Sequence, residues 1–189
     1  NLLVALVLTM ASSLVLGMGL PTAAAYILVA TLTAPALVSM GVDLMAAHMF
    51  VFYSAMLSSI TPPVALAAFA AAAICREPPM RVAMISVKFG FVAFLLPYFF
   101  VLEPRLLGMG DIGETVGVFA MAVVGVLSLA CVLQGYAFGK LTTLSRIVIG
   151  IAALAVLMPD LKFKLIGIAT ILAVLVAWKI GQFTKSNQN

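Results

Sequence analysis

The sequence predicts an all-α integral membrane protein: a helical bundle with a re-entrant helical hairpin and a broken helix, followed by further transmembrane helices. Of its 189 residues, 65% are hydrophobic and 8% are charged, and the mean hydropathy is +1.28. The apolar residues form continuous runs, which favours membrane helices over alternating membrane strands. The net charge of +4 is small and spread over short loops, so the lipid bilayer is the expected environment and nucleic acid is not an expected partner.

The first interruption of the apolar sequence lies at residues 17–22, between apolar runs at residues 2–16 and 23–40. Its sequence is Gly17-Met18-Gly19-Leu20-Pro21-Thr22, and two glycines and a proline this close together unwind a helix. A tight connection at the membrane surface and a break at depth both fit this pattern. We predict a broken helix whose free carbonyls could bind an ion.

The second interruption lies inside an apolar region at residues 44–74 and reads Ser58-Ser59-Ile60-Thr61-Pro62-Pro63-Val64. Two adjacent prolines disrupt the hydrogen bonds of a lipid-facing helix, and each flank is shorter than the roughly 20 residues that cross a bilayer. We therefore predict a re-entrant hairpin, with Thr61 as the cap of the second arm and Pro62 and Pro63 in its first turn. A proline-kinked spanning helix and a short turn outside the membrane are the alternatives.

The remaining segments are assigned by their apolar length. Alanine is dense at residues 64–74, which predicts that this arm packs closely inside the protein. Four apolar runs and a polar tail follow, at residues 82–102, 115–138, 147–158, 165–180 and 182–189. We divide the chain into a transport region at residues 1–107 and C-terminal transmembrane helices with a short polar tail at residues 108–189. Because Asn1 stands within an apolar run, we expect a longer protein whose N-terminal part is a partner of this chain.

Titratable side chains that could form a catalytic pair are scarce in the apolar segments. His48 is the single histidine, and its isolated position is more typical of a structural hydrogen bond than of a ligand. Cys75 and Cys131 are far apart and lack metal-ligand spacing. No nucleophile-elbow or His-Glu-x-x-His motif is present. We predict no enzymatic activity and no cofactor, and the rival hypothesis of an intramembrane enzyme is disfavoured.

The groups that remain for chemistry are hydroxyls and carbonyls at the two interruptions. Unwound backbone with Ser and Thr offers neutral oxygens to a dehydrated sodium ion, and a half-helix N-terminus favours a carboxylate. Backbone and neighbouring side chains could instead satisfy these hydroxyls, which is the structural alternative. The candidate sodium ligands are Gly17, Met18, Gly19, Thr22, Ser59 and Thr61. The candidate substrate-binding residues are Ser58, Ser59, Thr61 and Pro63.

Three segments resemble a known family, the large membrane subunit of the tripartite ATP-independent periplasmic (TRAP) transporters, and most closely its fused permeases of the TAXI type. These segments are residues 17–27 (GMGLPTAAAYI), 47–53 (AHMFVFY) and 60–70 (ITPPVALAAFA). The resemblance covers about residues 10–107, and from about Gly108 it extends only to hydropathy. Ser59 departs from the family pattern, which often has Asp before Ile-Thr-Pro-Pro, and this changes the charge and the ligand set expected there.

The resemblance implies a sodium-driven, elevator-type importer of an organic acid in the bacterial inner membrane, with multiple passes and sodium as the coupling ion. It also implies delivery by a periplasmic solute-binding protein and two inverted repeats, of which this chain would hold the second. The alternative is a non-transporting membrane anchor or scaffold subunit of a complex, in which the Thr-Pro-Pro turn would lie outside the membrane and contact a partner.

Overall fold

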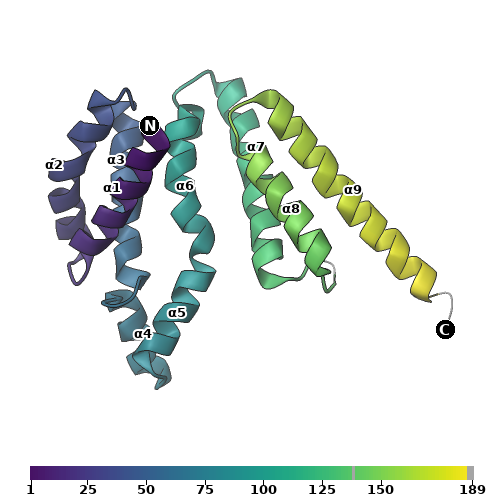
Figure 1. Ribbon diagram of the computed structural model, residues 1–189, viewed down its shortest axis with the longest axis horizontal. Coiled ribbons are helices and arrows are strands. Elements are labelled where there is room, and N and C mark those ends of the chain that lie inside the picture. The colour runs from purple at the N-terminus through teal and green to yellow at the C-terminus, as the bar shows by residue number, and fades with distance from the viewer. Residues whose placement is uncertain (138, 187–189) are drawn as a thin grey trace. The chain divides into compact units, whose positions relative to one another are not determined.

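A computed structural model describes residues 1–137 and 139–186, and most of these residues are helical (Figure 1). The helices are α1 (Leu2–Gly17), α2 (Thr22–Ser39), α3 (Leu44–Leu57), α4 (Leu66–Cys75), α5 (Pro79–Phe89), α6 (Phe91–Leu102), α7 (Ile112–Gln134), α8 (Thr143–Val156) and α9 (Leu161–Ser186). Two short 3-10 helices are η1 (Ser58–Ile60) and η2 (Pro104–Leu107). The chain forms two compact units, unit 1 (Asn1–Met109) and unit 2 (Gly110–Asn189), which divide two residues after the predicted boundary.

Length and composition identify the helices that can cross a membrane. Within the described residues, α2 and α7 are long and apolar enough, and α5 with α6 forms a third candidate that is bent by 43°. Helices α1, α3, α4 and α8 are apolar but shorter. These features agree with the predicted membrane helical bundle. The run predicted as one crossing at residues 82–102 is instead divided between two helices.

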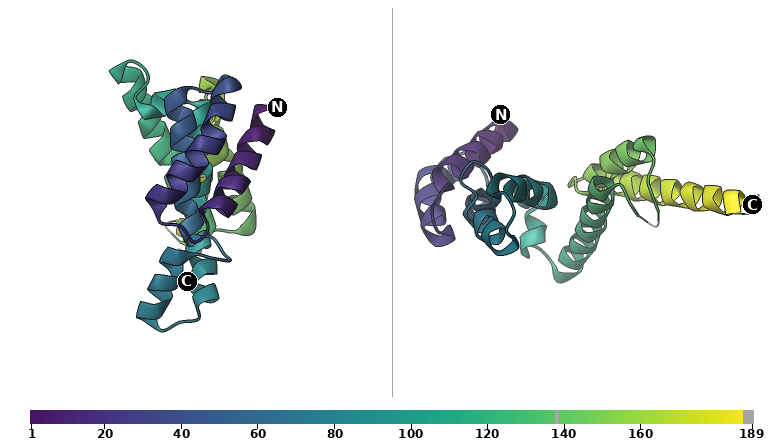
Figure 2. Two further views of the ribbon diagram at one scale, coloured as in Figure 1. Left: turned by 90° about the vertical axis from the view of Figure 1, so that its left-hand side faces the viewer. Right: turned by 90° about the horizontal axis from the view of Figure 1, so that it is seen from below.

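The core of unit 1 lies between its first three helices, which pack against one another, and α6 packs against α3 (Figures 1 and 2). Phe50 of α3 is the largest fully buried side chain of this core. Its ring meets Tyr98 of α6 edge-to-face at a centroid distance of 5.2 Å, and Tyr53 meets Phe100 in the same way at 5.3 Å. Aromatic pairs of this geometry add to the burial energy, so they hold α6 against α3.

The arms of a hairpin occur at the first interruption rather than at the second. Helices α1 and α2 pack side by side on either side of the turn at residues 18–21, as hairpin arms do. Helix α4 packs along α5 and extends beyond the end of α3 instead of folding back along it (Figures 1 and 2). The physical reason is that α1, α2 and α6 already cover α3. Residues 44–74 therefore form a broken helix in the structure, where a re-entrant hairpin was predicted.

The start of α4 also differs from the prediction. The helix begins at Leu66 with Ala65 as its N-cap, and no side chain caps it. Thr61 therefore does not cap this helix, and Pro62 and Pro63 precede it in a turn that contains the cis peptide bond between them.

The alanine-rich arm is buried only along a narrow stripe, where Ala68 and Ala72 are 2% and 1% exposed. Most of its other side chains are exposed in this chain, so close packing of the whole arm inside the complete protein stays a prediction.

Helix α4 meets α5 through small side chains. The buried cluster between them consists of Ala65, Ala68 and Ala83, with Phe69 and Val82 packed at its margin. This cluster is the apolar contact that makes α4 and α5 a pair.

Unit 2 consists of α7, α8 and α9, with α8 packed against both neighbours. Glycines permit the close approaches: a Cβ on Gly125 would lie 2.9 Å from Leu157 Cγ, and one on Gly167 would lie 2.6 Å from the carbonyl oxygen of Ala152. Arg146 donates from Nε to the Val132 carbonyl at 2.9 Å and so caps the end of α7. The predicted polar tail overlaps α9 as far as Ser186, and residues 187–189 lie outside the described part.

Candidate functional site

Three interruptions of the helices in unit 1 meet around η1. The short helix contacts α1, α3, α4 and α5, so it touches four helices that come from distant parts of the sequence. We call residues 58–65, which comprise η1 and the turn before α4, the tip segment. We call residues 18–21 the α1–α2 turn. Two of the three interruptions were predicted from the sequence, and the third lies at Gly90 between α5 and α6.

The end of α1 lies against the start of the tip segment. Gly17 and Ser58 are both buried, and a Cβ placed on Gly17 would lie 2.6 Å from Ser58 Oγ and 3.0 Å from Ser58 Cβ. It would also lie 3.4 Å from the Ala55 carbonyl oxygen of α3. Because residue 17 has no side chain, the last turn of α1 can lie against the last turn of α3. The last carbonyls of each helix carry the negative end of that helix's dipole, so two negative helix ends meet here.

The α1–α2 turn lies beside the other end of the tip segment. Met18 is extended, and Gly19 has a φ of +77°, a conformation that L-residues with a side chain rarely adopt. A Cβ on Gly19 would lie 3.5 Å from Val64 Cγ1, which is ordinary contact distance. Helix α2 then begins without a side-chain cap, because its N-cap residue is Pro21. Its first N–H groups are left for another acceptor.

The third interruption joins the tip segment to α5 and α6. A Cβ on Gly90 would lie 2.6 Å from Cδ1 of Ile60 in η1. This contact was not predicted, because residues 82–102 were expected to form one membrane crossing interrupted by Lys88. The available signal was a glycine within an apolar helix, close after Lys88, since glycine costs about 1 kcal/mol relative to alanine in a helix.

The hydroxyls of the tip segment share one arrangement, in which each donates its proton to a carbonyl three or four residues earlier. The bonds run from Ser58 to Ala55, from Ser59 to Met56 and from Thr61 to Leu57, at 2.6, 2.7 and 2.7 Å. Backbone carbonyls thus satisfy the hydroxyl protons, as the structural alternative predicts. A hydroxyl also has two acceptor lone pairs, so these oxygens keep the capacity to face a cation.

The remaining predicted residues lie around this cluster with different exposure. Met18 is partly buried, whereas Thr22 in the first turn of α2 and Pro63 in the tip segment are exposed. The structure thus brings Gly17, Gly19 and the tip segment together, while Thr22 lies on the outer surface of the α2 N-terminus. Within the described residues, no group of three or more His, Cys, Asp or Glu side chains could hold a metal ion. The oxygens gathered here come from Ser, Thr and the backbone.

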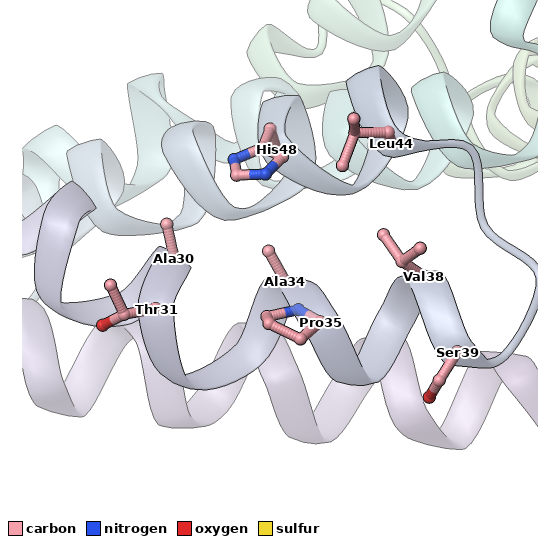
Figure 3. Close-up of a pocket in the computed structure, with 8 residues that line it drawn as sticks. All are labelled: Ala30, Thr31, Ala34, Pro35, Val38, Ser39, Leu44 and His48. Carbon is pink, nitrogen blue, oxygen red and sulfur yellow. The ribbon is translucent and has the colours of Figure 1, made fainter.

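A separate hollow of about 580 Å³ lies between α2 and α3 (Figure 3). His48 and Leu44 of α3 face Ala34 and its neighbours on α2 across this hollow (Figure 3). His48 Nδ1 lies 3.0 Å from the Tyr26 hydroxyl, so the histidine has the structural hydrogen bond that its sequence context favours. The walls are mostly apolar, and the arrangement offers no cluster of ligands for an ion.

Comparison with known families gives one match. Residues 1–111 match the family described as the DctM component of the tripartite ATP-independent periplasmic transporters. No curated protein and no solved structure matches the chain. The matched residues include all three interruptions and the whole of the tip segment.

Proposed function

Because this chain belongs to the DctM component family of the tripartite ATP-independent periplasmic transporters, we propose that it is part of a sodium-coupled permease that imports an organic acid. Membership makes the chain a component of a secondary transporter and an integral membrane protein. The finer proposal concerns the ion, the substrate and the residues that bind them. It rests above all on the contact between Gly17 and Ser58, which joins two interrupted helices.

The sodium ion would lie between the end of α1 and the tip segment. Interrupted helices in secondary transporters coordinate sodium with unwound carbonyls and with the C-terminal ends of half-helices. Here Gly17 at the end of α1 lies against Ser58, whose hydroxyl proton already points to a backbone carbonyl, and the Gly17 carbonyl accepts from the Leu20 N–H at 3.2 Å while its second lone pair could face a cation. Ser59, Thr61, Gly17, Met18 and Gly19 are the proposed ligands. Thr22 is a weaker candidate because it is exposed at the start of α2.

The substrate carboxylate would lie at the opposite end of the tip segment. Helix α4 begins without a side-chain cap, and although the Leu66 N–H donates to the Val64 carbonyl at 3.2 Å, the N–H groups that follow it are available to an anion. To bind the carboxylate as well, the hydroxyls of Ser58, Ser59 and Thr61 would have to turn their protons from the backbone carbonyls toward the anion. A bound sodium ion beside it would neutralise the negative charge, which gives a physical basis for coupling the two ligands.

The proposal includes the wider assembly implied by the family. A periplasmic solute-binding protein would deliver the organic acid, and the remaining N-terminal part of the permease would supply a second, inverted repeat. The complex would lie in the bacterial inner membrane as a multi-pass protein. The proposed permease would use sodium as its coupling ion, with no other cofactor and no enzymatic step.

Sodium-dependent stabilisation tests the ion site without knowledge of the substrate. The purified complete permease would be heated in detergent at increasing sodium chloride, with choline chloride holding the ionic strength constant. A ligand that binds only the folded state stabilises it by RT ln(1 + [L]/Kd), so the dependence of the unfolding temperature on sodium concentration gives Kd, the half-saturating concentration. Thr61→Val removes a hydroxyl while keeping the shape, and we expect the half-saturating sodium concentration to rise about tenfold. Thr61→Ser should restore most of the affinity.

Thr33→Val is the matched control. Its hydroxyl also donates to a carbonyl four residues earlier, Val29, at 2.9 Å and is partly buried, but it belongs to the middle of α2 rather than to the tip segment. This variant should keep the wild-type response to sodium. An unchanged response in Thr61→Val, or no specific effect of sodium on the wild type, would contradict the proposed ion site.

A further inference from the structure

We propose that Gly90 is a positioning residue for the cation site, because it forms the socket that receives Ile60 and thereby fixes the tip segment. This inference rests on the proposed function, since it concerns how the same oxygens are held. It goes further because it assigns a role in ion binding to Gly90, which has no side chain to offer the ion and lies at the junction of α5 and α6.

Residue 90 requires glycine because of the close contacts around it and not because of its backbone conformation. Its φ and ψ are −78° and 0°, which residues with a side chain also adopt. A Cβ at this position would lie 2.6 Å from Ile60 Cδ1 and 3.1 Å from the Ser86 carbonyl oxygen. The second contact is with backbone of the same helix end, so the new methyl group could not move away from Ile60. The isoleucine would have to move instead.

Movement of Ile60 affects the proposed ligands directly. Ile60 stands between Ser59 and Thr61, and all three residues belong to one tight turn in which the Thr61 N–H donates to the Ser58 carbonyl at 3.2 Å. Because the overlapping atom is the terminal Cδ1, rotation about χ2 would relieve the contact and take Cδ1 out of the socket. The short helix η1 would then lose the side-chain contact that fixes it beside Gly90, and the Ser59 and Thr61 oxygens would be held less firmly.

The socket also connects the tip segment to the bend between α5 and α6. These helices meet at Gly90 with an angle of 43°, and α5 contacts η1. The Ile60 side chain lies at this bend, and Ser58, two residues earlier, contacts Gly17 at the end of α1. The tip segment is therefore held between two glycine positions, one at the end of α1 and one at the start of α6.

The experiment combines a clash with its relief. In the complete permease, Gly90→Ala should raise the half-saturating sodium concentration for thermal stabilisation about tenfold. Ile60→Val removes the Cδ1 atom and should have an effect of about twofold or less on its own. The double variant Gly90→Ala/Ile60→Val should return to within about twofold of wild type, because the overlapping atom is absent. The unfolding temperature without sodium reports any purely structural effect.

Gly117→Ala provides a matched control, since a Cβ at this position in α7 would meet no atom within 4 Å, and it should leave the sodium response unchanged. If Gly90→Ala does not accumulate as folded protein, Ile60→Ala takes its place, because an empty socket should also weaken sodium binding. An unchanged sodium response in Gly90→Ala or in Ile60→Ala overturns the inference, as does a loss that Ile60→Val fails to rescue.

The experiments distinguish failure of the proposed ion site from failure of the positioning role of Gly90. If Thr61→Val weakens sodium binding and Gly90→Ala does not, the ion site stands and only the positioning role fails. If the wild-type permease shows no specific response to sodium, the proposed function fails and the positioning role fails with it.

Discussion

Unit 1 and unit 2 are both built from apolar helices, but they differ in where the helices end. The helices of unit 1 contain 10 to 18 residues, and three of its interruptions meet around η1 inside the unit. In unit 2, α7 extends over 23 residues and α9 over 26. Each interruption leaves backbone polar groups without helical partners, and such groups cost several kcal/mol each when they are buried in an apolar environment. Unit 1 gathers three interruptions around one short helix, and this distinguishes it from unit 2.

The two units also use glycine for different purposes. In unit 1, Gly17 and Gly90 each make room for a side chain of the tip segment, Ser58 and Ile60 respectively. In unit 2, glycines let neighbouring helices approach, as Gly167 does against α8. The same missing Cβ therefore makes room for side chains of the tip segment in unit 1 and increases packing density in unit 2. Under the proposed function, replacement of the glycines around the tip segment should mainly affect ligand binding, and replacement of those in unit 2 should mainly affect stability.

The largest expected effect is that of Gly19→Leu. Residue 19 has a φ of +77°, which strains any residue with a side chain, and the leucine would press toward Val64. We expect sodium-dependent stabilisation and sodium-dependent uptake to be lost in the complete permease, while circular dichroism still reports a folded helical protein. Gly41→Leu is the matched control, because residue 41 has a φ of +88° but a Cβ there would meet no atom within 4 Å. Normal sodium dependence in Gly19→Leu would remove the α1–α2 turn from the site.

The next effect concerns the narrow buried stripe of α4. Ala68 is 2% exposed and packs against α5, so Ala68→Trp should reduce the free energy of unfolding by about 3 kcal/mol or more. Ala71, on the same helix, is exposed, and Ala71→Trp should change the stability of the chain by less than about 0.5 kcal/mol. Denaturant unfolding of each variant in detergent measures the difference. Equal effects at the two positions would mean that α4 is covered by another part of the complete permease.

The smallest of these effects is that of Gly167→Ala in unit 2. The added methyl group would lie 2.6 Å from the Ala152 carbonyl oxygen and 2.7 Å from Val156 Cγ2, so α9 would have to shift from α8. We expect a loss of about 1–3 kcal/mol in stability and an unchanged half-saturating sodium concentration. Gly150→Ala is the control, since its Cβ would lie 3.6 Å from the nearest atom, Val132 Cγ1. A weakened sodium response in Gly167→Ala would contradict the division of roles between the units.

The sequence located the first two interruptions correctly because glycine and proline act on the local backbone. It could not show which interruption joins two packed arms, since that depends on whether α3 has a free face for α4. The contact between Gly17 and Ser58 links residues that are far apart in sequence, and the contact between Ile60 and Gly90 does the same. Glycine within the apolar run marks residue 90 as unusual, but the local sequence does not show which residue either glycine contacts.

Two further details of the candidate site depend on neighbouring helices and could not be predicted from the local sequence. Thr61 precedes an apolar helix and has the side chain of a cap, but its hydroxyl bonds back to Leu57 because η1 continues the direction of α3. The alanines after Val64 were expected to pack closely inside the protein, and in this chain only the face toward α5 is buried. Residue type limits what a position can do, and the neighbouring helices decide which of those possibilities occurs.

The alanine contact between α4 and α5 has a mechanical consequence. Packed helices normally interlock because the side chains of one form ridges that fill the grooves of the other. Ala65, Ala68 and Ala83 present only methyl groups, so the ridges between the two helices are low. Small sliding movements of packed helices are a common form of conformational change, and low ridges reduce the barrier to them. Apart from Phe69 and Val82 at its margin, the α4–α5 contact would thus offer little steric resistance to a small shift of α4 along its axis, next to the tip segment.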